Sequence, residues 1–150
     1  MNHRGHRIPL LMAMTATLAS VGCAGNPAPG EPGYRFNLNG TYDALFSAQG
    51  MDFTGTADLA TVAGGAVTGT VRLTNPETVT AELEGMVSDS TFSFESTYSR
   101  AGGCEGALLG GGEIQSDGVG TSGDVDIADD CMGGVMEGSF RFTRSDEARP

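Results

Sequence analysis

The chain has 150 residues, which suits a single small domain. From Cys23 onward it has no lysine or histidine, and six arginines stand against 19 acidic residues, a net charge of −13. So acidic a surface disfavours nucleic acid and anionic lipid headgroups as partners. The missing histidine and lysine exclude Ser-His-Asp and Cys-His hydrolysis, Schiff-base chemistry and histidine-ligated metals. Carboxylate pairs could support glycosidase-type catalysis, but no spacing singles out a pair. We therefore expect no enzyme activity and no cofactor.

Residues 1–22 have the three-part layout of a secretory signal peptide. Arg4 and Arg7 lie in a short first part without acidic residues, and residues 8–21 are apolar or small. This apolar stretch contains Pro9 and is shorter than the roughly 20 residues that span a bilayer. We therefore expect a signal peptide rather than a permanent transmembrane helix, and an exported protein.

The segment Leu18-Ala19-Ser20-Val21-Gly22-Cys23 resembles the lipobox of bacterial lipoproteins. The resemblance implies cleavage before Cys23 and lipidation of that cysteine, so that the lipid anchors the protein to a membrane. Ser20 departs from the usual pattern, which has an aliphatic residue there. By resemblance to known sorting rules, Ala24 in place of aspartate implies the outer membrane where the envelope has two. The alternative is ordinary secretory cleavage after Ala24, which would release the protein without a lipid.

The mature chain divides by composition into three parts. Residues 23–33 are rich in proline and glycine, which predicts an extended tether between the anchor and the domain. Residues 34–145 are predicted to form the β-barrel domain, and residues 146–150 a disordered tail.

From Phe36 to Phe142, apolar residues or glycines alternate with polar ones, which indicates strands with one buried face. We predict eight strands joined by hairpins, at residues 36–46, 51–60, 66–74, 79–87, 91–99, 105–115, 120–128 and 134–143. The fold class is therefore all-β: an eight-stranded antiparallel up-and-down meander, closed into a soluble barrel because closure removes exposed edges. The alternative is a transmembrane barrel; the missing tryptophan and the acidic polar face argue against it.

Hairpin register predicts a disulfide. Asp117-Gly118 is a strong signal for a two-residue type I′ turn, in which paired residues have numbers that add up to 235. This register sets Leu108 opposite Ile127 and Cys104 opposite Cys131, and an oxidising compartment would let the two cysteines bridge. Cys23 is then the cysteine left over, in agreement with its lipidation.

Gly40-Thr41-Tyr42, with Arg141 or Arg144 near the last strand, resembles lipocalin and other calycin barrels. Those families usually have Gly-x-Trp with an arginine packed across the tryptophan, which Tyr42 replaces here. The resemblance implies an apolar small ligand, and the candidate lining consists of the inward aromatic residues Phe36, Tyr42, Phe53, Phe92, Phe94, Tyr98 and Phe140. The alternative is that these side chains simply fill the core. The many glycines near strand centres leave the same choice open, between tight curvature and space for a ligand.

The densest acidic cluster contains Asp124, Asp126, Asp129 and Asp130. Carboxylate oxygens suit calcium, although the cluster lacks the glycine and the terminal glutamate of an EF-hand loop. The alternative is a solvated rim of the barrel. The sequence as a whole predicts a non-enzymatic envelope lipoprotein that binds an apolar small molecule or a partner protein. Its alternative is a structural or surface lipoprotein with a filled core and no ligand.

Overall fold

The computed structural model describes residues 25–145. The predicted signal peptide, Cys23 and the predicted tail 146–150 lie outside the described residues. Eight strands follow one another along the chain: β1 (Gly40–Ala48), β2 (Met51–Thr61), β3 (Ala66–Asn75), β4 (Val79–Ser88), β5 (Thr91–Arg100), β6 (Glu105–Ile114), β7 (Gly120–Asp129) and β8 (Val135–Arg144). Between residues 25 and 145 there is no helix of the length and apolarity that a bilayer crossing requires.

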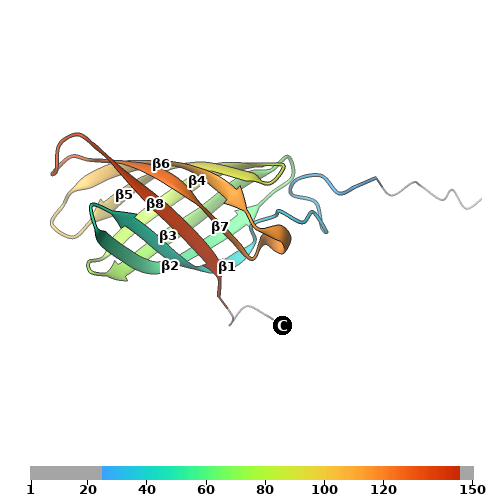
Figure 1. Ribbon diagram of the computed structural model, residues 1–150, viewed down its shortest axis with the longest axis horizontal. Coiled ribbons are helices and arrows are strands. Elements are labelled where there is room, and N and C mark those ends of the chain that lie inside the picture. Colours follow the sequence, from blue (N-terminus) through green and yellow to red (C-terminus); the bar gives the residue numbers. More distant parts are fainter. Residues whose placement is uncertain (1–24, 146–150) are drawn as a thin grey trace, which may run out of the picture.

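The strands form a closed antiparallel barrel (Figure 1). Each strand pairs with the next, and β1 pairs with β8, from Tyr42 opposite Arg144 to Ala48 opposite Gly138. Closure leaves no strand edge unpaired. Along β5, Phe92, Phe94, Ser96 and Tyr98 are buried while the residues between them are exposed. The predicted all-β meander and its closure are confirmed, and the apolar set faces the interior.

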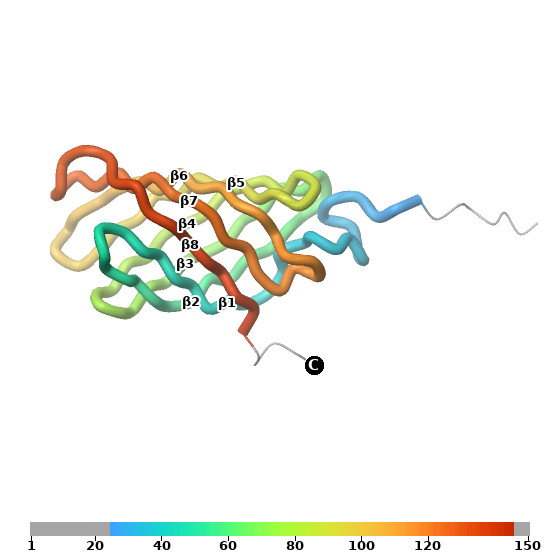
Figure 2. The backbone as a smooth tube through the Cα atoms, in the orientation of Figure 1, coloured from blue at the N-terminus to red at the C-terminus, as the bar shows by residue number. Residues whose placement is uncertain are grey.

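The two ends of the barrel differ (Figure 2). At one end lie the connections between β1 and β2, β3 and β4, β5 and β6, and β7 and β8, at residues 49–50, 76–78, 101–104 and 130–134. We call this the open end, at the left of both figures. The other connections and the N-terminal segment 25–39 lie at the closed end.

The N-terminal segment covers the closed end because several of its side chains face the barrel. Leu38 is fully buried, and its N–H donates a hydrogen bond to Oγ1 of Thr61 at 2.8 Å. The hydroxyl of Tyr34 donates to the carbonyl oxygen of Asp89 at 3.0 Å, across the barrel end. This segment also explains why the first strand begins at Gly40, four residues later than predicted.

The part of the predicted tether that the structure describes, residues 25–33, is only partly extended. From Ala28 onward the chain makes successive turns, in which the N–H of Gly30 donates to Oδ1 of Asn37 at 2.8 Å. The N–H of Gly64 donates to the carbonyl oxygen of Pro29 at 3.1 Å, which ties these turns to the barrel. A proline-rich segment can pack here because turns satisfy its few N–H groups internally.

The hairpin register predicted from Asp117-Gly118 is confirmed, because Leu108 pairs with Ile127. The turns at 49–50 and 89–90 likewise pair Phe46 with Phe53 and Val87 with Phe92. The turn at Asp117-Gly118 differs in form, because it is a short 3-10 turn, η1 (Ser116–Gly118), rather than a two-residue hairpin turn. Asp117 and Gly118 both have positive φ as expected, so the register is unchanged. Cys104 and Cys131 form the predicted disulfide, with their Cα atoms 5.7 Å apart.

Aromatic rings fill the middle of the barrel. Their centroids lie 5.0 to 6.5 Å apart, and the cluster comprises Phe46, Phe92, Phe94, Phe140 and Phe142. A Cβ at Gly110 would lie 2.4 Å from the ring of Phe94, so this glycine makes room for a core side chain. Gly112 and Gly123 face each other, and a Cβ at either would strike the neighbouring backbone. At these positions the glycines serve core packing and curvature rather than a ligand.

Candidate functional site at the open end

A cavity of about 80 Å³ opens at the open end of the barrel. Its walls are mostly apolar side chains from β1, β2, β3, β4, β6, β7 and β8, namely Phe46, Ala48, Met51, Phe53, Leu73, Val79, Leu108, Ile127 and Met136, with Met132 from the loop after β7. Phe46 also belongs to the aromatic cluster, so the cavity ends where the filled core begins. An apolar depression with a small number of polar groups at its edge is the usual form of a small-molecule site.

Three methionines line this cavity. Met51 follows the first turn of the open end, Met132 lies in the loop between β7 and β8, and Met136 lies near the start of β8. Met51 and Met132 are about half exposed, at 48% and 47%. Methionine side chains are flexible and polarizable, and proteins use them at surfaces that adapt to different apolar partners. The rim of the cavity is therefore its most adaptable part.

A polar network borders the same cavity. Asp129, at the end of β7, is buried and accepts a hydrogen bond from the hydroxyl of Tyr98 at 2.7 Å. Arg100 places Nη2 3.2 Å from Oδ1 of Asp129 and Nε 3.0 Å from Oδ2, the latter without hydrogen-bond geometry. Glu77 accepts from Nη1 of Arg100 at 3.0 Å. One cation thus lies between two carboxylates, and the network keeps one net negative charge.

Two opposing effects set the pKa of Asp129. Burial alone would raise it, but hydrogen bonds from Tyr98, Arg100 and the backbone N–H of Cys131, together with the charge of Arg100, hold the pKa of Asp129 below its usual range. Burial and the neighbouring Asp129 carboxylate raise the pKa of Tyr98. Tyr98 therefore stays a neutral donor and Asp129 an ionised acceptor at neutral pH.

Only two of the seven predicted ligand-binding residues, Phe53 and Tyr98, line this cavity. Phe92, Phe94 and Phe140 lie in the filled middle, as the alternative of a packed core describes. The remaining two lie at the closed end. Phe36 is partly buried there, and the hydroxyl of Tyr42 donates a hydrogen bond to the carbonyl oxygen of Gly118. Sequence reasoning missed Glu77, Arg100 and the three methionines. The methionines carried a usable signal, since all of them flank predicted turns of one barrel end.

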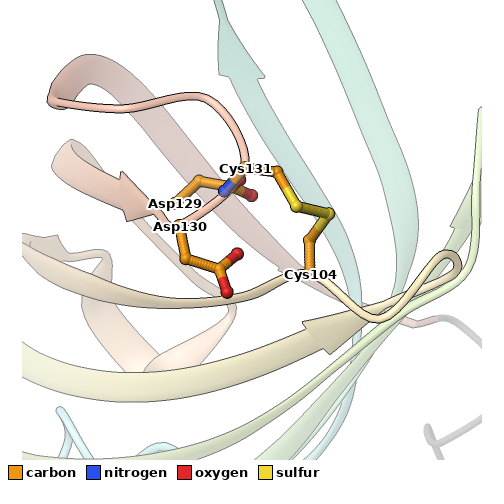
Figure 3. A group of neighbouring side chains, drawn as sticks. All are labelled: Cys104, Asp129, Asp130 and Cys131. Atoms are coloured by element: carbon orange, nitrogen blue, oxygen red, sulfur yellow. A yellow bond between two sulfur atoms is a disulfide. The ribbon is translucent and has the colours of Figure 1, made fainter.

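The four predicted calcium candidates do not come together in one site. Asp124 and Asp126 are exposed on the outer face of β7, as a solvated rim would have them. Asp129 and Asp130 lie beside the disulfide of Cys104 and Cys131 (Figure 3), and the carboxylate oxygens and sulfurs of these two aspartates and two cysteines lie within 4.8 Å of one another. The two sulfurs are bonded to each other, Asp129 is paired with Arg100, and Asp130 accepts from the N–H of Glu105. With the disulfide formed and both carboxylates engaged in these contacts, the four side chains have a structural role in the barrel.

At the closed end, Arg144 packs on Tyr42. Its guanidinium carbon lies 5.5 Å from the ring centroid, and Nη2 donates to the Tyr42 hydroxyl at 3.1 Å. The hydroxyl donates in turn to the carbonyl oxygen of Gly118 at 3.0 Å. Of the two arginines that the calycin resemblance allowed, Arg144 occupies this place, while Arg141 is exposed on the outer wall.

The comparisons with known proteins show similarity of fold. No protein-family model and no curated protein matches the sequence. Among solved structures, the chain resembles EF1p2_mFAP2b bound to DFHBI, with a TM-score of 0.57 and 12% identity over 72% of this chain and 94% of that one. It also resembles a redesigned beta barrel, mFAP1, bound to DFHBI, with a TM-score of 0.52 and 14% identity over 71% of this chain and 94% of the other. These similarities define the chain as a small β-barrel protein.

Proposed function

We propose that this protein is a lipid-anchored envelope protein whose barrel binds an apolar small molecule at its open end. The observation that carries the proposal is the cavity there, which apolar and methionine side chains line and the Tyr98, Arg100 and Asp129 network borders. The opposite end is covered by the N-terminal segment, so access is from one side. Both similar barrels are bound to DFHBI, which supports binding by a barrel of this kind.

The size of the cavity limits the ligand. Its volume of about 80 Å³ is well below the roughly 300–1,000 Å³ of pockets for drug-sized ligands. A ligand therefore either is small or inserts only an apolar part, and movement of Met51 and Met132 would enlarge the space. The filled aromatic middle stops the ligand from passing deeper into the barrel.

The anchor rests on the lipobox resemblance of residues 18–23. The disulfide supports the anchor in two ways. It joins Cys104 to Cys131 and so leaves Cys23 as the remaining cysteine, and such a bond is compatible with export to an oxidising compartment. The packing of Arg144 on Tyr42 supports the calycin resemblance in the same way. Because the chain enters the barrel at the closed end, an anchor at Cys23 directs that end to the membrane and leaves the cavity facing away.

A binding experiment tests the ligand site. We expect the uncharged apolar dye Nile red, or DFHBI, to bind the purified mature protein saturably, as measured by fluorescence. Ile127→Trp and Met136→Trp place bulk at the cavity and should each raise Kd at least about tenfold. Met86→Trp is the matched control, because Met86 is 46% exposed on the outer wall at a distance from the cavity.

Thermal melts of all three variants check that they remain folded. Absence of saturable binding, or equal binding by every variant, would contradict the proposal and favour a structural lipoprotein with a filled core. The anchor has its own test: the intact mass of the protein extracted from the cell envelope should include acyl chains on Cys23. An unmodified N-terminus beyond Cys23 would show that the protein is released instead.

A further inference from the structure

A groove of about 710 Å³ runs along the outside of the barrel wall, on the opposite face of the wall from the ligand cavity proposed above. Five strands contribute exposed side chains to it: Glu82 and Glu84 from β4, Glu95 from β5, Leu109 from β6, Asp126 from β7 and Val135 from β8. The outer face of a barrel in water is usually polar, so apolar side chains in this hollow need an explanation.

The apolar part of the groove is continuous across three strands. Ala107 pairs with Ala128, and Ala128 pairs with Val135, so small side chains form a floor from β6 to β8. Leu109 lies one outward position away from Ala107. Leu109 and Val135 are 63% and 67% exposed, more than any other large apolar residue between residues 25 and 145. Exposed apolar patches with polar borders are typical of interaction sites.

The border of the groove is acidic, and no neighbouring positive charge balances its carboxylates. Glu84 lies directly opposite Glu95, a pairing of like charges that destabilises a sheet. Strand pairing continues from Glu95 through Leu109 to Asp126, and Asp126 lies opposite Glu137, so these residues form one row across the wall. Within the described residues no arginine shares this row or the next, and the ion pairs all involve Arg100 at the open end. The barrel thus holds a local repulsion that a cationic partner would relieve.

We propose that this groove binds a basic segment of a partner protein that carries apolar side chains among its lysines or arginines. The apolar residues of the partner pack on Leu109 and the alanine floor, and its cations lie against Glu84, Glu95 and Asp126. Charge complementarity selects this occupant, because nucleic acid and anionic lipid would be repelled by the same carboxylates. The outward leucine and valine distinguish the groove from a site for a bare metal ion, which needs oxygen ligands only.

Calorimetric titration with two synthetic peptides tests the proposal on the purified mature protein. One peptide consists of lysine and leucine in an amphipathic helical pattern, and in the other serine replaces every leucine. We expect the leucine peptide to bind at least about fivefold more tightly, and binding to weaken as salt rises from about 50 to about 300 mM. Glu84→Gln with Glu95→Gln, and separately Leu109→Ser, should each raise Kd at least about fivefold for the leucine peptide.

The matched control is Asp43→Asn with Glu113→Gln, which removes the same charge from other parts of the outer wall. We expect this pair to change Kd by less than about twofold. Equal weakening by both pairs, or equal affinity for both peptides, would show general attraction to an acidic protein and overturn the proposal. A calcium-dependent rise in melting temperature that Glu84→Gln with Glu95→Gln abolishes would overturn it in favour of a metal site.

Discussion

The guanidinium group of Arg144 lies over the ring of Tyr42 and shares the carbonyl oxygen of Gly118 with the tyrosine hydroxyl. This contact joins the first and last strands to the turn before β7 at the closed end. It combines a cation–π contact with charge-assisted hydrogen bonds, and burial raises the pKa of Tyr42, so the hydroxyl stays protonated.

Replacing Arg144 should therefore destabilise the barrel. We expect Arg144→Met to lower the free energy of unfolding by about 1.5–3 kcal/mol, the range for hydrogen bonds to charged groups. Arg141→Met removes the same charge from an exposed position of the same strand and should change stability by less than about 0.5 kcal/mol. Urea denaturation of both variants measures the difference, and equal costs would show that the contact with Tyr42 contributes nothing.

Reduction of the disulfide should also lower stability. Cys104 and Cys131 are 27 residues apart, and the chain-entropy relation for a loop of this size gives about 3–4 kcal/mol. Melting curves with and without reductant, and of Cys104→Ser with Cys131→Ser, check this value. A melting temperature that reductant leaves unchanged would contradict it, provided that the mass shift confirms reduction.

Asp129 should make stability depend on pH in the acidic range. Its pKa is lowered in the folded protein, so the stabilisation is present above the unfolded pKa of about 3.9 and is lost as pH falls through the folded pKa. We expect Asp129→Asn to cost about 1.5–3 kcal/mol at pH 7, because a charged acceptor of Tyr98 and Arg100 is replaced. The difference between wild type and variant should shrink below about pH 4.

Comparison of the two proteins at each pH cancels the effect of the other carboxylates, whose mutual repulsion also weakens in acid. Chemical denaturation between pH 3 and pH 7, at values chosen about one unit apart, measures the difference. A constant gap across this range would show that the ionisation of Asp129 is not coupled to folding.

The close approach of β6 and β7 predicts a strong contrast between two glycines. A Cβ at Gly123 would lie 2.1 Å from the carbonyl oxygen of Gly111, so Gly123→Ala must push the strands apart and should cost about 1–3 kcal/mol. A Cβ at Gly111 itself points outward and meets only the carbonyl oxygen of Phe92, at 3.6 Å. Gly111→Ala should be neutral or stabilise by up to about 1 kcal/mol, because glycine is costly inside a strand. Equal melting temperatures would contradict this contrast.

Period-two alternation and turn chemistry predicted nearly the whole fold. Asp117-Gly118 sets the register that brings Cys104 and Cys131 together, and this inference needed no long-range information. The course of residues 34–39 was not predictable in this way, since Phe36 and Leu38 continue the alternation of a strand. They form a cover instead, because the closed end offers apolar side chains and a partner for Leu38 in Thr61.

The site was predicted less well than the fold. The alternation of apolar and polar residues shows which side chains face inward, but it does not show which end of the barrel holds a cavity. The alternation predicts that Phe92 and Phe53 both face inward. Phe92 lies in the aromatic cluster, however, whereas Phe53 lines the cavity. Arg100 and Glu77 come from a strand end and a loop, where alternation carries no information about contacts. Their ion pair depends on how two connections meet in space.

The disulfide fixes one side of the open end and leaves the other side without a covalent link. It joins the loop between β5 and β6 to the loop between β7 and β8, beside Asp129 and Met132. On the opposite part of the rim, the turn at 76–78 is tied to the bridged side by the Glu77–Arg100 ion pair and by the hydrogen bond from the N–H of Ala101 to the carbonyl oxygen of Thr78. The turn at 49–50 is held by the pairing of β1 with β2. Any widening of the cavity by a ligand should therefore occur by displacement of the turn at 49–50, with the bridged loops as a fixed reference.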